Sequence, residues 1–320
     1  MAEPTPPEPV SFRWPAEWEP LEAVWVVPPH NPETWPGCLD EAQREHAAWC
    51  EAMSEVVRVR ATDELGIATN DSWVRDFGPL FVLDASGQIV VQDFRFNGWG
   101  DKYEIRDLDN VVPRKLADAL DLSIVSHDFV LEGGALDTDG RGTLLTTPGC
   151  LLNPNRNGEM SRTDIEQRLH ETLGITRTIW VDLPPNGLPG DDTDGHIDNA
   201  VRFVSPSTVV IHPAIDPSPL YPADLKVIPL PEVEPIFYDY PADRFGPAKR
   251  MQLPASYANF LIANGRVFVP TFGQPSDDIA LRTMDDAMPN HSPVPIRSNH
   301  LVVGQGALHC LSMQQPAASP

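Results

Sequence analysis

The stretch DDTDGHIDNAVRFV, residues 191–204, sets one histidine within a run of acidic residues and ends in an apolar segment. The apolar, β-branched ending predicts a strand over 195–204. Side chains two positions apart in a strand share a face, so His196 and Asp198 would point into the same space. Nearby carboxylates favour the imidazolium, and we expect His196 to hold a proton near neutral pH. This arrangement suits catalysis on a cationic substrate, although an acidic surface turn before a strand has the same pattern.

Polar residues recur in or beside predicted strands along the rest of the chain. Asp76, Glu132, His196, Asn259 and Cys310 follow one another at intervals of roughly 60 residues. The spacing suggests five similar modules around an axis, each delivering the end of a strand to a shared centre. No self-similarity between the modules is visible in the sequence, which weakens the argument for a repeat.

The composition indicates a folded protein with an acidic surface. Of the 320 residues, 41% are hydrophobic, and 12 Phe and 8 Trp support a substantial core. The 35 prolines are about twice the ~5% share of an average protein, which predicts short elements joined by rigid loops. The net charge of -23 argues against nucleic acid or an anionic membrane as partner and permits a cationic substrate.

Neither an export signal nor a membrane span is expected. The first residues, MAEPTPPEP, lack the basic and apolar regions of a signal peptide, and no window approaches 18 uninterrupted apolar residues. The four cysteines have no CxxC spacing, so we expect reduced thiols and a cytoplasmic location. Cys38, Cys50 and Cys150 are expected to be buried small apolar residues.

Periodicity and turn residues predict a single domain of hairpins and helices over 12–316, between a disordered leader over 1–11 and a tail over 317–320. The proline-rich stretch 213–254 is expected to be a long ordered loop. Helices are predicted over 39–57, 112–120 and 162–173. Further strands are predicted over 21–28, 78–84, 89–96, 129–137, 142–147, 208–213, 257–270 and 300–313.

Cys310 is the strongest candidate for a nucleophile. It lies in VGQGALHCLSM, residues 303–313, after Gly304 and Gly306, which allow close approach of the backbone. A thiol attacks only as thiolate, which requires a cationic or polarising neighbour. His309 would point to the opposite face of a strand and is therefore a poor general base for Cys310.

Two further segments hold carboxylates suited to a cation. In NDSWVRDFGPLFV, residues 70–82, Asp76 can bind a guanidinium through two hydrogen bonds, and Trp73 can stabilise the cation with its ring face. A loop closed by local salt bridges, with Trp73 in the core, explains the same segment equally well. Glu132 sits in the apolar run FVLEGGALD, residues 129–137, and therefore needs a partner such as His196 or a substrate.

Five blocks of this sequence resemble the agmatine deiminase family, within the guanidino-group-modifying superfamily. Peptidylarginine deiminases of the bacterial type share the same motifs. The blocks are NDSWVRDFGP, LEGGALDTDGRGTLLTTPGCLLNPNRN, DDTDGHIDNAVRF, ASYANFLIANGRVFVP and GQGALHCLSMQQP, and the opening FRWPAEWEPLEAVWVVPPHNPETWPG is similar as well. The resemblance runs in order from about residue 12 to 316. It implies a single α/β domain with the five-bladed, pseudo-fivefold α/β-propeller called the pentein fold, and a site at its centre.

The resemblance also implies roles for individual residues. Cys310 would be the nucleophile, and His196 the general acid and base. Asp76 and Asp198 would grip the guanidinium, while Glu132 would contact the guanidinium or orient His196. The remaining substrate-binding candidates are Trp73 as a wall of the channel, Asn259 near the site, and Asp192 toward the distal end of the substrate.

The implied reaction converts agmatine to N-carbamoylputrescine and ammonia, a step of putrescine biosynthesis, through a covalent amidino-cysteine intermediate. It requires neither a metal nor an organic cofactor, and a homodimer or a higher homo-oligomer is compatible with it. Gln305 stands where the family usually has glycine, and Ala307–Leu308 and Ser312–Met313 replace other usual pairs. These departures leave substrate specificity open.

Three alternatives remain at this point. The first keeps the mechanism but takes peptidyl-arginine or another guanidino compound. The second is a metal-dependent hydrolase with ligands from His196, Asp198, Glu132 and either His212 or His309. The third is a cation-binding propeller without catalysis. The motifs GxSxG, GxxxxGK[ST], GxGxxG and HExxH are absent from the chain.

Overall fold

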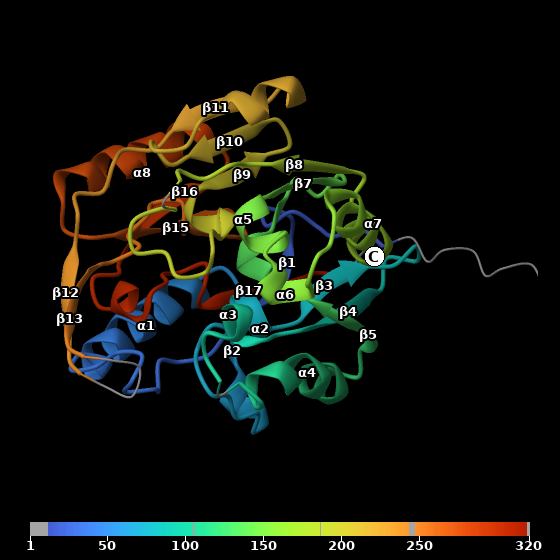
Figure 1. The fold of residues 1–320 in the computed structure, drawn as a ribbon, viewed down its shortest axis with the longest axis horizontal. Coiled ribbons are helices and arrows are strands. Elements are labelled where there is room, and N and C mark those ends of the chain that lie inside the picture. The colour runs from blue at the N-terminus through green and yellow to red at the C-terminus, as the bar shows by residue number, and fades with distance from the viewer. Residues whose placement is uncertain (1–11, 105, 186, 243–246, 319–320) are drawn as a thin grey trace, which may run out of the picture.

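The computed structural model describes residues 12–104, 106–185, 187–242 and 247–318. Within them, five three-stranded sheets share one topology, in which the first two strands pair antiparallel and the third lies parallel to the second. A parallel third strand needs a crossover connection, and a helical segment supplies it in every sheet. The fold is therefore the five-bladed α/β-propeller expected from the sequence (Figure 1).

The five sheets follow one another along the chain, except that the first is completed by the last strand. Their strands are β17 (Ser312–Pro316), β1 (Leu21–Val26) and β2 (Arg58–Ala61); β3 (Leu80–Leu83), β4 (Ile89–Arg95) and β5 (Ser123–Val130); β6 (Asp137–Thr138), β7 (Thr143–Thr146) and β8 (Arg177–Trp180); β9 (Val201–Ser205), β10 (Thr208–Ile211) and β11 (Lys226–Pro229); and β14 (Leu261–Ala263), β15 (Arg266–Thr271) and β16 (Ser292–Arg297).

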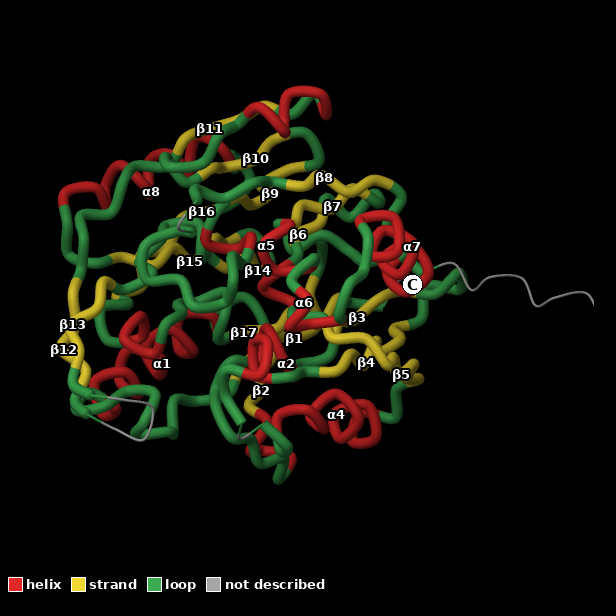
Figure 2. The backbone as a smooth tube through the Cα atoms, viewed as in Figure 1, coloured by secondary structure: helices red, strands yellow, loops and turns green. Residues whose placement is uncertain are grey.

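The crossover helices lie at the periphery and short helical turns lie near the centre (Figure 2). The crossovers are α1 (Leu39–Ser54), α4 (Val112–Leu120), α7 (Arg162–Leu173), η5 (Ser218–Ala223) and α8 (Pro275–Ala287). The other helical segments are η1 (Thr62–Leu65), α2 (Val74–Phe77), α3 (Gly98–Asp101), η2 (Asp109–Val111), η3 (Gly133–Ala135), α5 (Pro148–Leu151), α6 (Pro154–Asn157), η4 (Ile197–Asn199) and η6 (Leu301–Gly304).

Each sheet is preceded by a tight turn that holds one of the five recurring polar residues. Asp76 lies in α2 before β3, Glu132 at the start of η3 before β6, and His196 at the start of η4 before β9. Asn259 and Cys310 lie in turns before β14 and β17. The spacing along the sequence therefore reflects one repeated position, just before the first strand of each sheet.

The predicted strand over 195–204 is wrong in its first half. His196 to Asn199 form the start and body of η4, and β9 begins only at Val201. The predicted strand over 300–313 is also wrong, because η6 and a turn occupy most of it and β17 begins at Ser312. Both segments contain charged or reactive side chains whose placement requires a turn rather than an extended chain.

Two other expectations need correction. The predicted strand over 129–137 is interrupted by η3, since at Gly133 the backbone passes so close to Arg75 that a Cβ would lie 2.2 Å from the Arg75 carbonyl oxygen. The stretch 213–254 is more than a loop, since it contains η5, β11 and a separate hairpin of β12 (Phe237–Tyr240) and β13 (Lys249–Gln252).

The helix predictions are largely confirmed. The bounds of α4 and α7 match the predicted ranges, and α1 ends three residues early, at Ser54. The sequence analysis missed α8, which begins with Pro275 and is capped by Gln274 and Asp277. No helix in the described part of the chain is long and apolar enough to span a bilayer.

Pairing of β1 with β17 completes the first sheet. Leu21 pairs with Pro316, and the buried Trp25 donates its indole N–H to the Gln315 side chain at 2.8 Å. The Ala317 N–H donates to the Pro20 carbonyl, so the first residue of the predicted tail over 317–320 is hydrogen-bonded to the segment before β1. The predicted leader over 1–11 and residues 319–320 lie outside the described residues.

Replacing Trp25 with alanine should lower the free energy of unfolding by about 3–5 kcal/mol, because its side chain is fully buried in the sheet that β1 and β17 share. Chemical denaturation followed by circular dichroism measures the effect. Glu22→Ala is the matched control, since Glu22 is the exposed residue of the same strand and should change stability by no more than about 0.5 kcal/mol. Equal effects of the two substitutions would contradict the importance of this pairing.

Candidate active site

A cavity of about 1010 Å³ lies where the central turns of the ring meet. Cys310, His196, Asp76, Trp73 and Asp192 line it. The three other residues predicted for the site, Glu132, Asp198 and Asn259, are buried directly behind this lining and contact it through hydrogen bonds. The structure thus brings the predicted site residues together from separate sheets.

His196 is held between two carboxylates, Glu132, which was expected as its partner, and Asp76. Its Nε2 lies 2.9 Å from a Glu132 oxygen, and its Nδ1 lies 3.6 Å from Asp76 Oδ1. Burial disfavours the charged ring, but Asp76 and Glu132 are among the groups that raise the pKa of His196 well above its ordinary value. The predicted pairing of His196 with Asp198 on one strand face is wrong, because these residues lie in η4 rather than in a strand.

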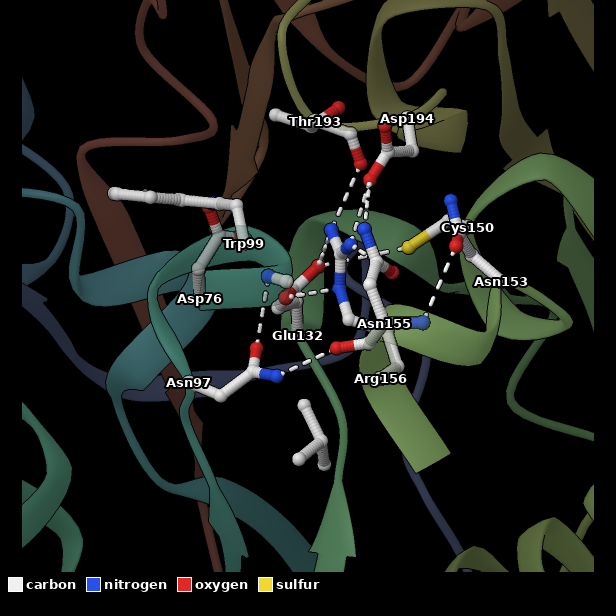
Figure 3. A network of polar contacts seen from close by, with 12 residues as sticks. Asp76, Asn97, Trp99, Glu132, Cys150, Asn153, Asn155, Arg156, Thr193 and Asp194 are labelled. Carbon is white, nitrogen blue, oxygen red and sulfur yellow. Dashed lines mark hydrogen bonds and ion pairs between the residues drawn. The ribbon is translucent and has the colours of Figure 1, made fainter. Parts of the chain in front are cut away.

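Glu132 is fixed by an arginine that the sequence analysis did not single out (Figure 3). Arg156 in α6 donates from Nε and Nη2 to the two Glu132 oxygens at 2.7 and 3.0 Å, and from Nη1 to Asp194 at 2.7 Å. Burial opposes ionisation of Glu132, but His196 and Arg156 lower its pKa. The Cys150 thiol lies 3.5 Å from the same carboxylate, so this cysteine is buried as expected but has a polar neighbour.

Asp76 faces the cavity with both oxygens engaged. Oδ1 accepts the Gly134 N–H at 2.9 Å, and Oδ2 accepts the Trp99 indole N–H at 3.0 Å (Figure 3). Burial raises the pKa of Asp76 to about 6, against the opposing charge of His196. Trp99 reaches Asp76 from α3, where residues 98–101 all have positive φ, a conformation that the two glycines Gly98 and Gly100 make accessible.

Asn259 holds Cys310 in place through hydrogen bonds. The Asn259 side-chain amide donates to the thiol sulfur at 3.1 Å, and its oxygen accepts the backbone N–H groups of His309 and Cys310 at 3.0 and 3.3 Å. Burial, together with the charges of Asp198 and Asp76, raises the pKa of the Cys310 thiol well above its ordinary value. Without a cation in the cavity, the thiol is therefore protonated.

Asp198 lies beside the Cys310 sulfur, and one of its carboxylate oxygens has no hydrogen-bond partner among the described residues. Its Oδ2 accepts from His309 Nδ1 at 2.8 Å and lies 3.4 Å from the Cys310 sulfur. Its Oδ1 is buried and has no hydrogen-bond partner among the described residues. A buried carboxylate oxygen without a donor is costly, which indicates a place for a ligand donor.

Trp73 forms a wall of the cavity and packs tightly against the segment that carries Cys310. Its ring stacks on Trp35 with 5.4 Å between ring centroids. A Cβ on Gly306 would lie 2.5 Å from the Trp73 ring and 2.9 Å from Cys310 Cβ, so glycine is required at this close approach.

Acidic side chains gather in the part of the lining formed by loops. Asp192 accepts the Tyr103 hydroxyl at 2.8 Å, and burial raises the pKa of its carboxyl. Asp71, which is partly buried, and Asp109, which is buried, line the same cavity, and desolvation raises the pKa of both carboxyls. This part of the cavity is suited to a positive charge.

A family model described as Porphyromonas-type peptidyl-arginine deiminase matches residues 13–316. The chain belongs to this family. It is 34% identical to an agmatine deiminase of Pseudomonas aeruginosa, over 99% of both chains. It also resembles two solved structures: C. jejuni agmatine deiminase with substrate bound (TM-score 0.87, 27% identity, 99% of both chains) and agmatine deiminase of Enterococcus faecalis (TM-score 0.85, 29% identity, 97% of both chains).

Gln305 stands where the sequence resemblance led us to expect glycine, and its backbone has a conformation that favours glycine. Gln305 has a φ of 79°, a left-handed conformation in which a side chain is strained. Its amide donates to the Tyr240 hydroxyl at 2.5 Å, and both residues line the cavity. The hydrogen bond from Gln305 to Tyr240 therefore joins the segment before Cys310 to the hairpin of β12 and β13.

The ligand set considered for a metal-dependent hydrolase is not assembled. Among the described residues, the group whose ligand atoms lie close enough for a metal consists of Glu132, Cys150 and His196. Arg156 already binds both oxygens of Glu132, which sets a positive charge where a metal would need the carboxylate. Asp198, His212 and His309 are not part of the group. The donor set does not favour a metal ion.

Alanine at two adjacent glycines of this family member should have different effects. At Gly134 a Cβ would lie 2.5 Å from His196 Nδ1 and 2.7 Å from Asp76 Oδ1, so Gly134→Ala should displace these side chains and lower turnover of guanidino compounds by about 100-fold. At Gly133 the clash is with backbone, so Gly133→Ala should instead cost about 1–3 kcal/mol of stability.

Steady-state kinetics and thermal unfolding of both variants distinguish the two effects. Normal activity of a folded Gly134→Ala protein would show that His196 and Asp76 do not need their observed positions.

Proposed function

We propose that this chain hydrolyses agmatine to N-carbamoylputrescine and ammonia through a covalent intermediate on Cys310. The observation that carries the proposal is Asp198, whose carboxylate lies beside the Cys310 sulfur and has one buried oxygen without a partner among the described residues, while Cys310, Asp76 and His196 line the cavity. Two carboxylates, an imidazolium and a thiol are the groups that deimination of a guanidinium requires. The full-length similarity to agmatine deiminases supports the same reaction.

Substrate binding is assigned to Asp76 and Asp198. Asp198 Oδ1 offers an acceptor that no donor of the described residues occupies. Asp76 offers the lone pairs that remain free on its two oxygens, which the Gly134 N–H and the Trp99 indole N–H hold in position. Two fixed carboxylates hold a planar guanidinium in one orientation, which places its central carbon against the sulfur. Trp73 flanks the cation as a wall of the cavity.

The guanidinium itself activates the nucleophile. The charges of Asp198 and Asp76 raise the pKa of Cys310 in the free protein, and a bound cation offsets both. The thiol then loses its proton to solvent water and the thiolate attacks the central carbon, while Asn259 fixes the sulfur. The C–N bond to one amino group breaks, giving the amidino-cysteine intermediate.

His196 moves the protons of the reaction. As an imidazolium it protonates the departing amino group, which leaves as ammonia, and as a neutral base it takes a proton from the water that attacks the intermediate. The C–S bond then breaks to give the ureido product and to restore the thiol. Both Glu132 oxygens already accept from Arg156, and one of them lies 2.9 Å from His196 Nε2, which favours orientation of His196 over contact with the substrate.

The acidic part of the cavity lining favours an ammonium over a carboxylate. Asp192, Asp71 and Asp109 belong to this lining, and of its basic residues Lys102 and Arg106 are paired with Asp194 and Asp101, while Lys249 is exposed. Agmatine ends in an ammonium, and Asp192 is the proposed partner of this group. Peptidyl-arginine and other guanidino compounds are the alternatives, and a cytoplasmic location and a homo-oligomer stay predictions.

The first test measures ammonia and ureido product from agmatine, free arginine and a blocked arginyl peptide. Agmatine should be turned over well ahead of the other two, without loss of activity in a chelator, and Cys310→Ala should abolish turnover. Cys50→Ala is the matched control, since this half-buried cysteine of α1 is remote from the cavity lining and should keep normal activity. Turnover of the peptide alone would move the assignment to protein deimination.

The pH dependence tests the role of Asp76. Only its ionised form attracts a guanidinium, and its pKa is raised to about 6, so kcat/KM should fall as the pH drops through about 6. Asp198 and Glu132, whose pKa values are lowered, stay ionised in this range, and His196 stays protonated.

The control for this profile is Asp109→Asn, because burial raises the pKa of Asp109 to about 7 and this carboxyl also lines the cavity. The variant should keep the acid limb of the wild type. Loss of the acid limb in Asp109→Asn would show that Asp109, rather than Asp76, is the carboxyl that titrates.

A further inference from the structure

His309 lies between two carboxylates in the interior, away from the cavity. Its Nδ1 is 2.8 Å from Asp198 Oδ2, and its Nε2 is 3.0 Å from Glu17 Oε2. The imidazole is 2% exposed, and Glu17 and Asp198 are buried as well. Two hydrogen bonds from one ring therefore join the segment before β1 to η4.

Each ring nitrogen of His309 lies at hydrogen-bond distance from a buried carboxylate. Burial opposes ionisation of Glu17, but Arg202 and His309 hold the pKa of its carboxyl far below the ordinary value. Burial likewise opposes ionisation of Asp198, but the hydrogen bond from His309 lowers its pKa. An ionised carboxylate can only accept a hydrogen bond, so this geometry calls for a donor at both ring nitrogens.

Glu17 is anchored from three sides. It accepts from Arg202 Nη2 at 3.0 Å and from the Ile262 N–H at 2.6 Å, and Arg75 Nη2 lies 3.7 Å away. These partners come from β9, β14 and α2, so the carboxylate cannot follow His309 if the ring moves. The charged groups around His309 are Glu17, Asp198, Asp137, Arg75 and Arg202.

The ring determines which oxygen of Asp198 is left for a ligand. His309 occupies Oδ2, and the buried Oδ1 remains without a partner among the described residues. Asp76 is oriented differently, by Gly134 and Trp99 at the edge of the cavity. Without the ring, the Cys310 thiol would be the remaining side-chain donor to Asp198 among the described residues, and the carboxylate could rotate or take up a proton.

We propose that His309 is a positioning residue for the reaction: as an imidazolium braced by Glu17, it keeps Asp198 ionised and turns Asp198 Oδ1 toward the guanidinium. The role rests on the proposed function, since it acts through the carboxylate assigned to the substrate. A core histidine that only fills space would contribute to stability and leave the binding of substrate and its pH dependence unchanged.

The central variant is His309→Gln, which keeps a donor of similar size and removes the charge. A lost charge-assisted hydrogen bond should lower kcat/KM for agmatine by about 10- to 100-fold, expressed mainly as a higher KM, because Asp198 would bind the ground state as well. The acid limb of kcat/KM should move to higher pH, since Asp198 loses the cation that lowers its pKa.

Two further variants separate positioning from packing. Glu17→Gln should shift KM in the same direction, and the double variant should be no worse than His309→Gln alone, because both residues act along one path. His46→Gln is the matched control: His46 is buried in α1 and burial lowers its pKa to about 4, so it is a neutral core histidine. It should lower the melting temperature without changing KM or the pH profile.

Nitrogen NMR of the wild-type imidazole side chains provides a test that needs no variant. Both ring nitrogens of His309 should carry protons at neutral pH, and a neutral ring would overturn the proposal even if His309→Gln failed to fold. An unchanged KM and pH profile in folded His309→Gln, with active wild type, would overturn the positioning role alone. A wild type that turns over no guanidino compound would overturn the proposed function and, with it, this role.

Discussion

Charges that water cannot reach must be neutralised by other charges, and the centre of this ring is built around that requirement. Two chains of alternating charge run through it, and each ends in a carboxylate beside the cavity. One consists of Arg202, Glu17, His309 and Asp198, and the other of Arg156, Glu132, His196 and Asp76. A guanidinium between the two terminal carboxylates continues the alternation, which makes the empty site selective for a cation before any specific contact is considered.

The repeated architecture explains how such different residues meet. Every sheet starts from a central turn, and the fold requires only that this turn be tight and face inward. The five turns therefore carry different functional groups while the strands behind them retain the same pairing. This separation also explains why the modules show no sequence similarity, since strands need only apolar residues and each turn is shaped by its own neighbours.

Much of the fold and site could be predicted from the sequence, and the errors have a common cause. The regular spacing of the five polar residues is visible in the sequence alone, because each occupies the same position in its module. These residues are Asp76, Glu132, His196, Asn259 and Cys310. Local periodicity could not distinguish a strand from a turn where contacts with residues far away in the sequence determine the backbone conformation. Gly133, which packs against the Arg75 backbone, is an example. Nothing in the sequence around Arg156 or Glu17 indicated a function, because each acts through a partner distant in the sequence. Arg156 binds Glu132, and Glu17 binds His309, 292 positions away.

The pairing of β1 with β17 has a consequence for how the protein comes to its native state. Trp25 and Gln315, joined by a hydrogen bond, are 290 positions apart, so closing this sheet costs more chain entropy than any local hairpin. Cys310 reaches its place only when β17 is docked, because it directly precedes that strand. Partly ordered chains therefore expose a thiol without the surrounding carboxylates, and catalytic turnover reports completed folding rather than the mere presence of ordered sheets.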